Sequence, residues 1–187
     1  MNTIRLTPEE LHKCWMIANA RHQSARANGA VCTLELAAKD NPLDQDFVGI
    51  AGELAYCKAF GLDTSLVLED NRETLEELQQ GDINHNGVWV DLKSSRHPRA
   101  RLIYPVQKKH RAKAEYFCLT TIDKDVVTIH GFAHRDTFMR EENIGTLNGS
   151  RPLYILDQDQ LEKEPYFLTI KKATTGFKNI FDFRTSF

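Results

Sequence analysis

The order of hydrophobic patterns along the chain predicts an α/β fold. Two segments, about residues 8–28 and 44–61, repeat apolar residues at the three- and four-residue spacing of amphipathic helices. Three later segments, 88–94, 116–122 and 126–132, have the short, strongly apolar or alternating character of β-strands. The 187 residues (21.4 kDa) suit one domain that buries its own core, so we expect a single domain over residues 1–187.

The first helix has a clear start signal. Thr7 can cap the helix, Pro8 suits its first position, and Glu10 completes a capping box with Thr7. The apolar spacing continues to about Asn28, and Gly29 is a typical stop. We therefore expect a helix over about residues 8–28, followed by a connector over 30–43.

The second helix is expected to begin after Asp44 or Asp46 and to end at Gly61. It contains two internal glycines, Gly49 and Gly52. Each costs about 1 kcal/mol relative to alanine in a helix interior. That cost indicates that another part of the molecule approaches the helix closely there.

The strands are joined by recognisable turns. Asn86-Gly87 is the strongest short hairpin signal, with His85 expected at the hairpin tip, and Asp123–Asp125 joins the second strand pair. The remaining segments have weaker patterns. They predict a short strand at 65–68, an exposed acidic helix or loop at 72–80, a short helix at 135–140, and strands at 153–156 and 166–170.

Composition excludes several classes of protein. The mean hydropathy is −0.45, and no segment approaches the ~20 apolar residues of a membrane span or the core of a signal peptide. We therefore expect a cytoplasmic protein without a membrane partner. The four cysteines form no C-x-x-C pair, which favours reduced thiols over a zinc ribbon. No P-loop or G-x-S-x-G motif is present.

The net charge of −2 conceals a basic segment over residues 93–113. It holds eight basic residues and no acidic one: Lys93, Arg96, Arg99, Arg101, Lys108, Lys109, Arg111 and Lys113. A concentrated positive charge in an acidic protein suits a polyanion, because neutralised phosphates release counterions. The segment therefore indicates nucleic acid, with a solvated charged surface as the alternative.

A group of carboxylates and one lysine suggests catalysis. Asp91 and Lys93 are two residues apart on a predicted strand, so both side chains lie on one face. Asp82 precedes them by the length of a hairpin, and Glu53 follows two small residues on the second helix. If they converge, their oxygens suit a hard cation such as Mg²⁺ or Mn²⁺. The alternatives are that Asp91 and Lys93 form a plain surface ion pair, that Asp82 is a turn residue, and that Glu53 is an exposed helix glutamate.

Taken in order, these motifs resemble the PD-(D/E)xK nuclease superfamily, in particular its small phage and prophage members. The resemblance covers about residues 44–140 and leaves a helix before it (8–28) and an extension after it (150–187). The motifs that carry it are Gly49-x-x-Gly52-Glu53, Gly81-Asp82, Val90-Asp91-Leu92-Lys93-Ser94-Ser95, Leu102-Ile103-Tyr104-Pro105 and Val127–Phe132. One departure is that Gly81 stands where the family name has a proline.

The resemblance implies a mixed central β-sheet flanked by helices, with a restriction-endonuclease-like core. It implies that Asp82, Asp91 and the Leu92 carbonyl bind the metal and that Lys93 is the catalytic lysine. Glu53 would hold metal-bound water or a second ion. Gln107 lies where some relatives carry a polar active-site residue.

The sequence thus predicts a Mg²⁺- or Mn²⁺-dependent nuclease that hydrolyses phosphodiester bonds in DNA. Ser94 and Ser95 are candidate phosphate contacts, with packing at the strand end as the alternative. The aromatic and basic tail over 171–187 packs on the domain, makes a homodimer contact or stacks on nucleic acid. Two other functions stay open: a non-catalytic nucleic-acid-binding or virion-assembly module with the nuclease fold, and a hydrolase of another phosphoester.

Overall fold

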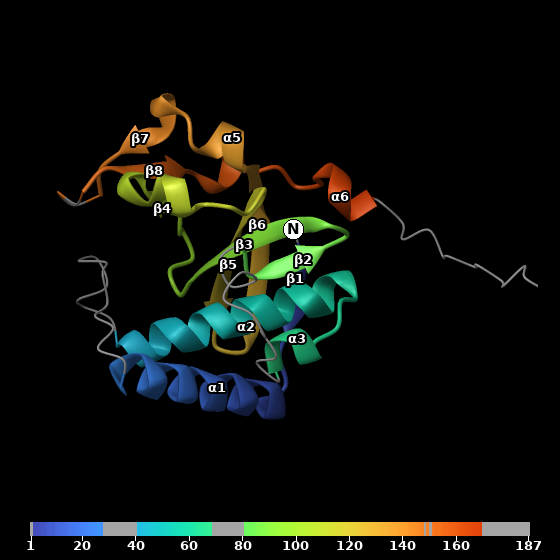
Figure 1. Cartoon of the computed structure of the whole chain (residues 1–187). Coiled ribbons are helices and arrows are strands. Elements are labelled where there is room, and N and C mark those ends of the chain that lie inside the picture. Colours follow the sequence, from blue (N-terminus) through green and yellow to red (C-terminus); the bar gives the residue numbers. More distant parts are fainter. Residues whose placement is uncertain (1, 28–40, 69–80, 148, 150, 170–187) are drawn as a thin grey trace, which may run out of the picture.

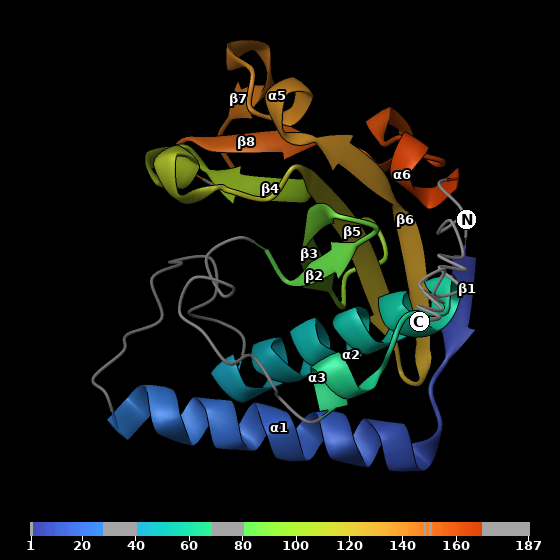
Figure 2. The ribbon, with the colours of Figure 1, turned by 45° about the vertical axis from the view of Figure 1, so that its right-hand side comes forward.

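The computed structural model describes residues 2–27, 41–68, 81–147, 149 and 151–169. Two long helices lie one behind the other on one side of a five-stranded mixed sheet (Figure 1). A smaller three-stranded sheet lies at the other side, together with short helices (Figure 2). The predicted α/β fold with a mixed sheet flanked by helices is therefore confirmed.

Three helices follow the first strand, and strands predominate in the later part of the described chain. The helices are α1 (Pro8–Ala27), α2 (Pro42–Phe60), α3 (Ser65–Leu68), α5 (Arg135–Phe138) and α6 (Tyr166–Thr169). The strands are β1 (Asn2–Arg5), β2 (Ile83–His85), β3 (Val88–Ser95), β4 (Leu102–Pro105), β5 (Tyr116–Asp123), β6 (Val126–His134), β7 (Ile144–Gly145) and β8 (Leu153–Leu156). Among the described residues, 3₁₀ turns occur at η2 (Val106–Arg111), η3 (Glu141–Asn143) and η4 (Gln158–Gln160). None of the described helices is both long enough and apolar enough to cross a membrane.

The larger sheet has the strand order β1-β6-β5-β3-β2. Strands β3 and β5 are parallel, and the other neighbouring pairs are antiparallel. The smaller sheet has the order β4-β8-β7 and is antiparallel. Because β2 spans only three residues, its pairing with β3 is limited to Val88–Val90.

The helix ends follow the capping signals of the sequence. At α1, the Thr7 backbone N–H donates to Glu10 Oε2 over 2.7 Å and the Glu10 N–H donates to Thr7 Oγ1 over 3.2 Å. The capping box is therefore confirmed. Helix α2 begins at Pro42, earlier than expected, because Asn41 accepts the Leu43 N–H and caps it. It ends at Gly61, which adopts a φ of 64°.

Two short segments expected to be strands are helices. Residues 65–68 form α3, because the Asp63 carboxylate accepts the Ser65 N–H and caps the turn. Residues 166–169 form α6 directly after Pro165, whose ring restricts φ to helical values. The segments expected at 72–80 and 171–187, and nearly all of the connector, lie outside the described residues.

The hairpin between β2 and β3 is confirmed. Asn86 and Gly87 both adopt positive φ (55° and 89°), as a two-residue hairpin of this type requires. His85 does end β2, but its ring is buried rather than exposed at a tip. Its Nδ1 lies 2.8 Å from Tyr56 Oη, and the ring of Phe167 packs edge-on against it.

Two apolar clusters lie on opposite faces of the larger sheet. On the helix side, α2 packs against β3, which contributes Val88, Val90 and Leu92, and α1 packs against α2. On the other side, the smaller sheet packs against Phe117 and Leu119 of β5. Cys14, Cys57 and Cys118 are buried free thiols, as expected for these three cysteines.

Substitution of Phe167 tests how α6 packs on the rest of the domain. Its ring is fully buried among the rings of His85, Tyr116 and Phe132. Phe167→Ala should lower the free energy of unfolding by about 3–5 kcal/mol, as is typical for a buried phenylalanine. Urea unfolding measures the loss, with Tyr166→Ala, on the exposed side of the same helix, as the matched control. An equal effect of the two variants would contradict this packing.

Candidate functional site

The alternation of β3 separates a core face from a polar face. Val88, Val90 and Leu92 face α2 and are buried. Asp91 and Lys93 each directly follow one of these buried residues, so their side chains emerge on the opposite face. That face looks toward the smaller sheet, and Lys93 approaches Tyr104 of β4 there. The predicted placement of Asp91 and Lys93 on one face is confirmed.

Asp82 reaches β3 through backbone contacts just before the hairpin. Its N–H donates to the Val90 carbonyl over 3.0 Å, and its Oδ2 accepts the Leu92 N–H over 2.7 Å. Gly81 makes this approach possible with a φ of 153°, and a Cβ there would lie 3.2 Å from the Val90 oxygen. Proline fixes φ near −65°, so this backbone cannot accept the proline of the family motif.

Asp91 and Lys93 form an ion pair close to Asp82. Their side chains are 19% and 35% exposed. Burial raises the pKa of Asp91 to about 6; the Asp82 carboxylate adds to the rise and Lys93 opposes it. Burial alone lowers the pKa of Lys93, but the Asp91 and Asp82 carboxylates outweigh burial and raise it. The group therefore combines a lysine that keeps its proton with a carboxyl group whose pKa lies above its usual range.

Tyr104 of β4 covers this group from the side of the smaller sheet. The Lys93 Nζ lies 5.8 Å from the centre of the Tyr104 ring, and Tyr104 is 9% exposed. Burial raises the pKa of Tyr104, with Asp91 adding to the rise and Lys93 and Arg111 opposing it. Tyr104 was not among the site residues expected from the sequence. The only available signal was its place in the motif Leu102–Pro105.

Glu53 does not join the other three residues. Helix α2 packs on the core face of β3, opposite the face of Asp91 and Lys93. Glu53 is 6% exposed there. Burial raises the pKa of Cys14 to about 12, and the negative charges of Glu10 and Glu53 add to this rise. The expected convergence of four groups is therefore wrong for Glu53. Among the described residues, no three His, Cys, Asp or Glu side chains lie close enough together to hold a metal ion.

Ser94 and Ser95 are engaged within the protein. Ser94 Oγ lies 2.8 Å from Thr120 Oγ1, on the core face beneath Gly52. Ser95 Oγ accepts the His97 N–H over 3.1 Å. Ser94 therefore packs at the strand end, which was the alternative to a phosphate contact, and Ser95 lies at the rim of the polar face.

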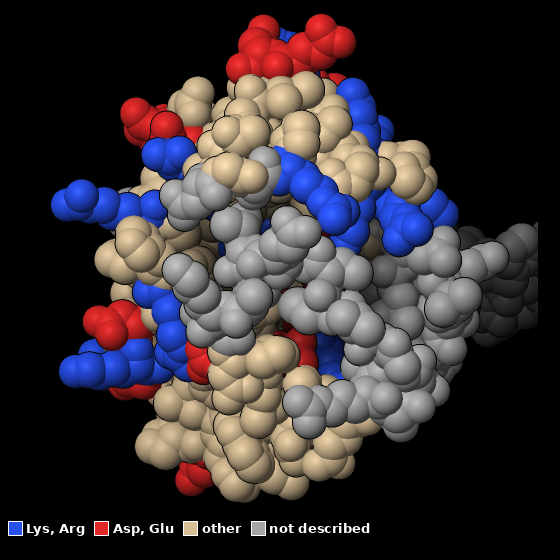
Figure 3. All heavy atoms as spheres, turned by 90° about the vertical axis from the view of Figure 1, so that its left-hand side faces the viewer, with Lys and Arg blue, Asp and Glu red and all other residues tan. Residues whose placement is uncertain are grey.

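The basic segment is partly neutralised by acidic neighbours. Arg96 makes two hydrogen bonds to Asp44, at 2.7 and 2.5 Å, and Arg101 lies 2.9 Å from Asp157. Lys109 donates to the Met139 carbonyl. The remaining predicted nucleic-acid contacts lie nearer to solvent. Lys108 is half-buried, and the exposed ones are Arg99, Gln107, Arg111 and Lys113. On the face in Figure 3, the Lys and Arg side chains form separate groups, several of them beside acidic ones.

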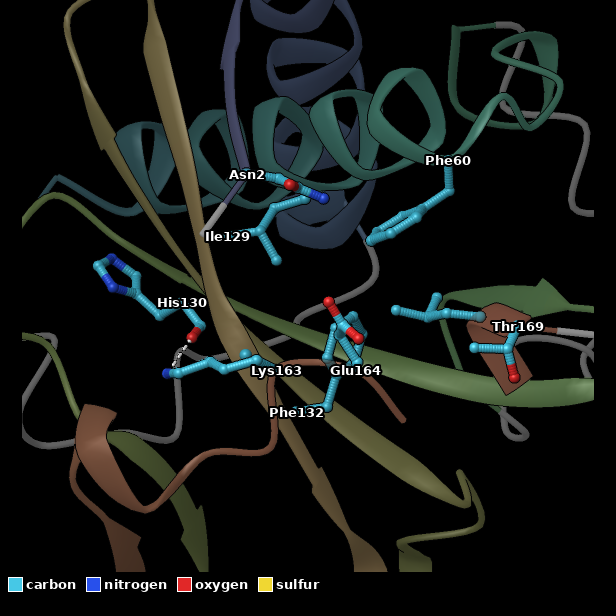
Figure 4. Close-up of a pocket in the computed structure, with 10 residues that line it drawn as sticks. Asn2, Phe60, Ile129, His130, Phe132, Lys163, Glu164 and Thr169 are labelled. Atoms are coloured by element: carbon cyan, nitrogen blue, oxygen red, sulfur yellow. Dashed lines mark hydrogen bonds between the residues drawn. The ribbon is translucent and has the colours of Figure 1, made fainter. Parts of the chain in front are cut away.

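A cavity of about 310 Å³ lies beside β6, away from this group. Figure 4 shows Asn2, Phe60 and Glu164 around it, with the ring of His130 turned to the other side of the strand. The Lys163 ammonium is held by the His130 and Gln158 carbonyls, at 2.6 and 2.9 Å. The β3 group differs from this cavity in its ion pair and in the shifted pKa values of Asp91 and Lys93, so the β3 group is the candidate functional site.

Comparisons of the chain with models of protein families, with curated proteins and with solved structures found no match. The functional argument therefore depends on the geometry and charge of the residues themselves. The group at issue comprises Asp82, Asp91, Lys93 and Tyr104, which we call the β3 site.

The raised pKa of Asp91 predicts a characteristic dependence of stability on pH. Between about pH 4, where the unfolded carboxyl ionises, and about pH 6, the folded state holds the proton more tightly. The free energy of unfolding should therefore fall as pH rises through this window and level off above it. Asp91→Asn should remove this component. Thermal melts of both proteins in EDTA from pH 4 to 8 measure it, and a pH-independent difference between them would contradict it.

Proposed function

We propose that this protein is a metal-dependent nuclease that hydrolyses phosphodiester bonds in DNA, with the β3 site as its active site. The observation that supports this most is the grouping of two carboxylates and a protonated lysine on the polar face of β3. Strongly perturbed carboxylates beside a specific charged partner are typical of functional sites. The hairpin, the parallel β3–β5 pair and helix α2 fit the proposed restriction-endonuclease-like core.

The β3 site fits one divalent cation. Mg²⁺ commonly takes one or two protein carboxylates and completes its shell with waters and substrate phosphate. Asp82 and Asp91, with the Leu92 carbonyl, would hold Mg²⁺ or Mn²⁺, and the charge of Asp82 already raises the pKa of Asp91. A divalent cation would relieve that repulsion. When bound, it would supply Lewis-acid stabilisation of the phosphoryl oxygens and lower the pKa of the attacking water.

The protein groups have separate roles in this proposal. Lys93 keeps its proton because Asp91 and Asp82 raise its pKa, so it would orient the water or offset negative charge on the phosphate. The Leu92 N–H fixes the orientation of the Asp82 carboxylate. Glu53 has no part in this proposal, because α2 holds it on the opposite face.

The partner would be DNA, bound through exposed cations. Arg99, Lys109 and Arg111 are exposed on the segment that leads from β3 past Tyr104. The charge of Arg111 acts on Tyr104, which places it beside the β3 site. Such cations would contact phosphates without reading sequence. The proposal includes a cytoplasmic location and leaves the 171–187 tail as a candidate homodimer contact.

A second function is favoured by the position of Glu53. Within the described part of the chain, Asp82 and Asp91 are the carboxylates that act on Lys93, so the chain would also suit a non-catalytic nucleic-acid-binding or virion-assembly module that keeps the fold. Such a module would bind DNA through the same cations, and its binding would not respond to metal. Metal-dependent cleavage separates the two functions.

Removing Lys93 should slow cleavage strongly and spare the fold. Lys93→Ala should lower the cleavage rate by roughly 10²–10⁴, the usual effect of losing one electrostatic or proton-handling group. Asp91→Asn should lower both metal affinity and rate, because a neutral amide is a weaker ligand than a carboxylate. The assay is cleavage of supercoiled plasmid and of single strands with Mg²⁺, Mn²⁺ or EDTA, beside calorimetric metal titration.

Lys124→Ala is the matched control, since Lys124 is an exposed lysine at the turn between β5 and β6. It should cleave at the wild-type rate. If Lys93→Ala does so as well, Lys93 has only a structural role. If the wild-type protein binds DNA but never cleaves it with either metal, the non-catalytic module is the better function.

The basic residues should differ in their contribution to DNA binding. Arg99→Glu and Arg111→Glu should each weaken binding and reduce the slope of log K against log salt, by about 0.9 for each lost phosphate contact. Arg96→Glu should change the slope less, because Asp44 already neutralises Arg96. Fluorescence anisotropy at several salt concentrations measures the slopes, with Lys124→Glu as the control. Equal slopes for all variants would show that the basic segment is a solvated surface.

A further inference from the structure

Two neighbouring tyrosines of the smaller sheet each have a lysine ammonium close to the ring. Tyr104 of β4 and Tyr154 of β8 are direct partners in the antiparallel register. The Lys93 Nζ lies 5.8 Å from the ring centre of Tyr104, and the Lys109 Nζ lies 5.6 Å from that of Tyr154. Only the first pair belongs to the β3 site. The Lys109–Tyr154 pair therefore serves as an internal control for the Lys93–Tyr104 pair.

The Tyr104 ring is held firmly in place. It packs edge-on against Phe117, with ring centres 5.4 Å apart, and its hydroxyl points toward the Lys108 carbonyl at 3.4 Å. Phe117 is the register partner of Asp91 on the neighbouring strand. The ring is therefore anchored to the strand next to the one that carries Asp91 and Lys93.

The ring and Asp91 hold the Lys93 ammonium in different ways. Lysine has a flexible four-carbon stem, so its ammonium needs fixed neighbours to stay in one place. Asp91 is its ion-pair partner, but a metal ion bound by Asp91 would compete for the same carboxylate. An aromatic face attracts an ammonium electrostatically and is no ligand for a hard cation such as Mg²⁺. The ring can therefore hold Lys93 while Asp91 is occupied.

We propose that Tyr104 is a positioning residue whose ring face keeps the Lys93 ammonium beside Asp82 and Asp91, including when a metal ion engages Asp91. The catalytic consequence rests on the proposed nuclease function. The placement of the ammonium over the ring does not, and it can be tested without any cleavage assay.

NMR spectroscopy of the folded protein tests the placement. The Lys93 side-chain methylene next to the ammonium should resonate upfield in the wild-type protein and in Tyr104→Phe, because of the ring current. Tyr104→Leu should abolish that shift, and Tyr154→Leu should leave it unchanged while removing the shift of Lys109. Adding Mg²⁺ to the wild-type protein should preserve the upfield shift. Persistence in Tyr104→Leu, or loss on adding Mg²⁺, would overturn the proposal.

Cleavage kinetics test the consequence. Tyr104→Leu should lower kcat by up to ~10²-fold with little change in KM, the effect expected of a misplaced group. Tyr104→Phe should retain most of kcat, and Tyr154→Leu should match the wild-type protein although it loses an equivalent aromatic ring. A kcat for Tyr104→Phe as low as that for Tyr104→Leu would make the hydroxyl the functional group and overturn the proposal. If the wild-type protein cleaves no DNA, the proposed function fails, and the NMR result alone decides the role of the ring.

Discussion

The close contact between α2 and β3 at Gly52 determines much of this structure. A Cβ at Gly52 would lie 2.1 Å from Ser94 Oγ and 2.8 Å from Thr120 Oγ1. The helix can therefore lie against two neighbouring strands only because this residue has no side chain. The contact explains why a helix-weakening residue occurs in the middle of a buried helix. It also fixes which face of the larger sheet forms the main apolar core.

The polar residues of β3 depend on that arrangement. Since side chains alternate along a strand, a helix seated over Val90, Leu92 and Ser94 directs Asp91 and Lys93 to the opposite face. The smaller sheet covers that face only in part, so both groups are sheltered from water without being fully removed from it. Partial burial beside Asp82 is what disturbs their ionisation.

Local features were predictable from the sequence, and relationships between distant elements were not. The capping box at Thr7, the Asn86-Gly87 turn and the shared face of Asp91 and Lys93 each follow from residues close in sequence. Glu53 was misplaced because helical spacing does not determine which face of the sheet a helix covers. The buried ring of His85 depends on Tyr56, a partner 29 residues away on α2. Tyr104 depends likewise on the packing of the two sheets.

The bond between Asn86 and Phe167 bears on the order in which the protein acquires its structure. Asn86 Nδ2 donates to the Phe167 carbonyl over 3.0 Å, across 81 residues of chain. This contact and the Phe167 ring brace the hairpin that delivers Asp82 to β3. Contacts of such sequence separation form late, because closing a long loop costs entropy before the contact is made. On a ribosome, the hairpin would reach its final packing only after residue 167 had emerged, so Asp82 would be among the last groups of the β3 site to settle.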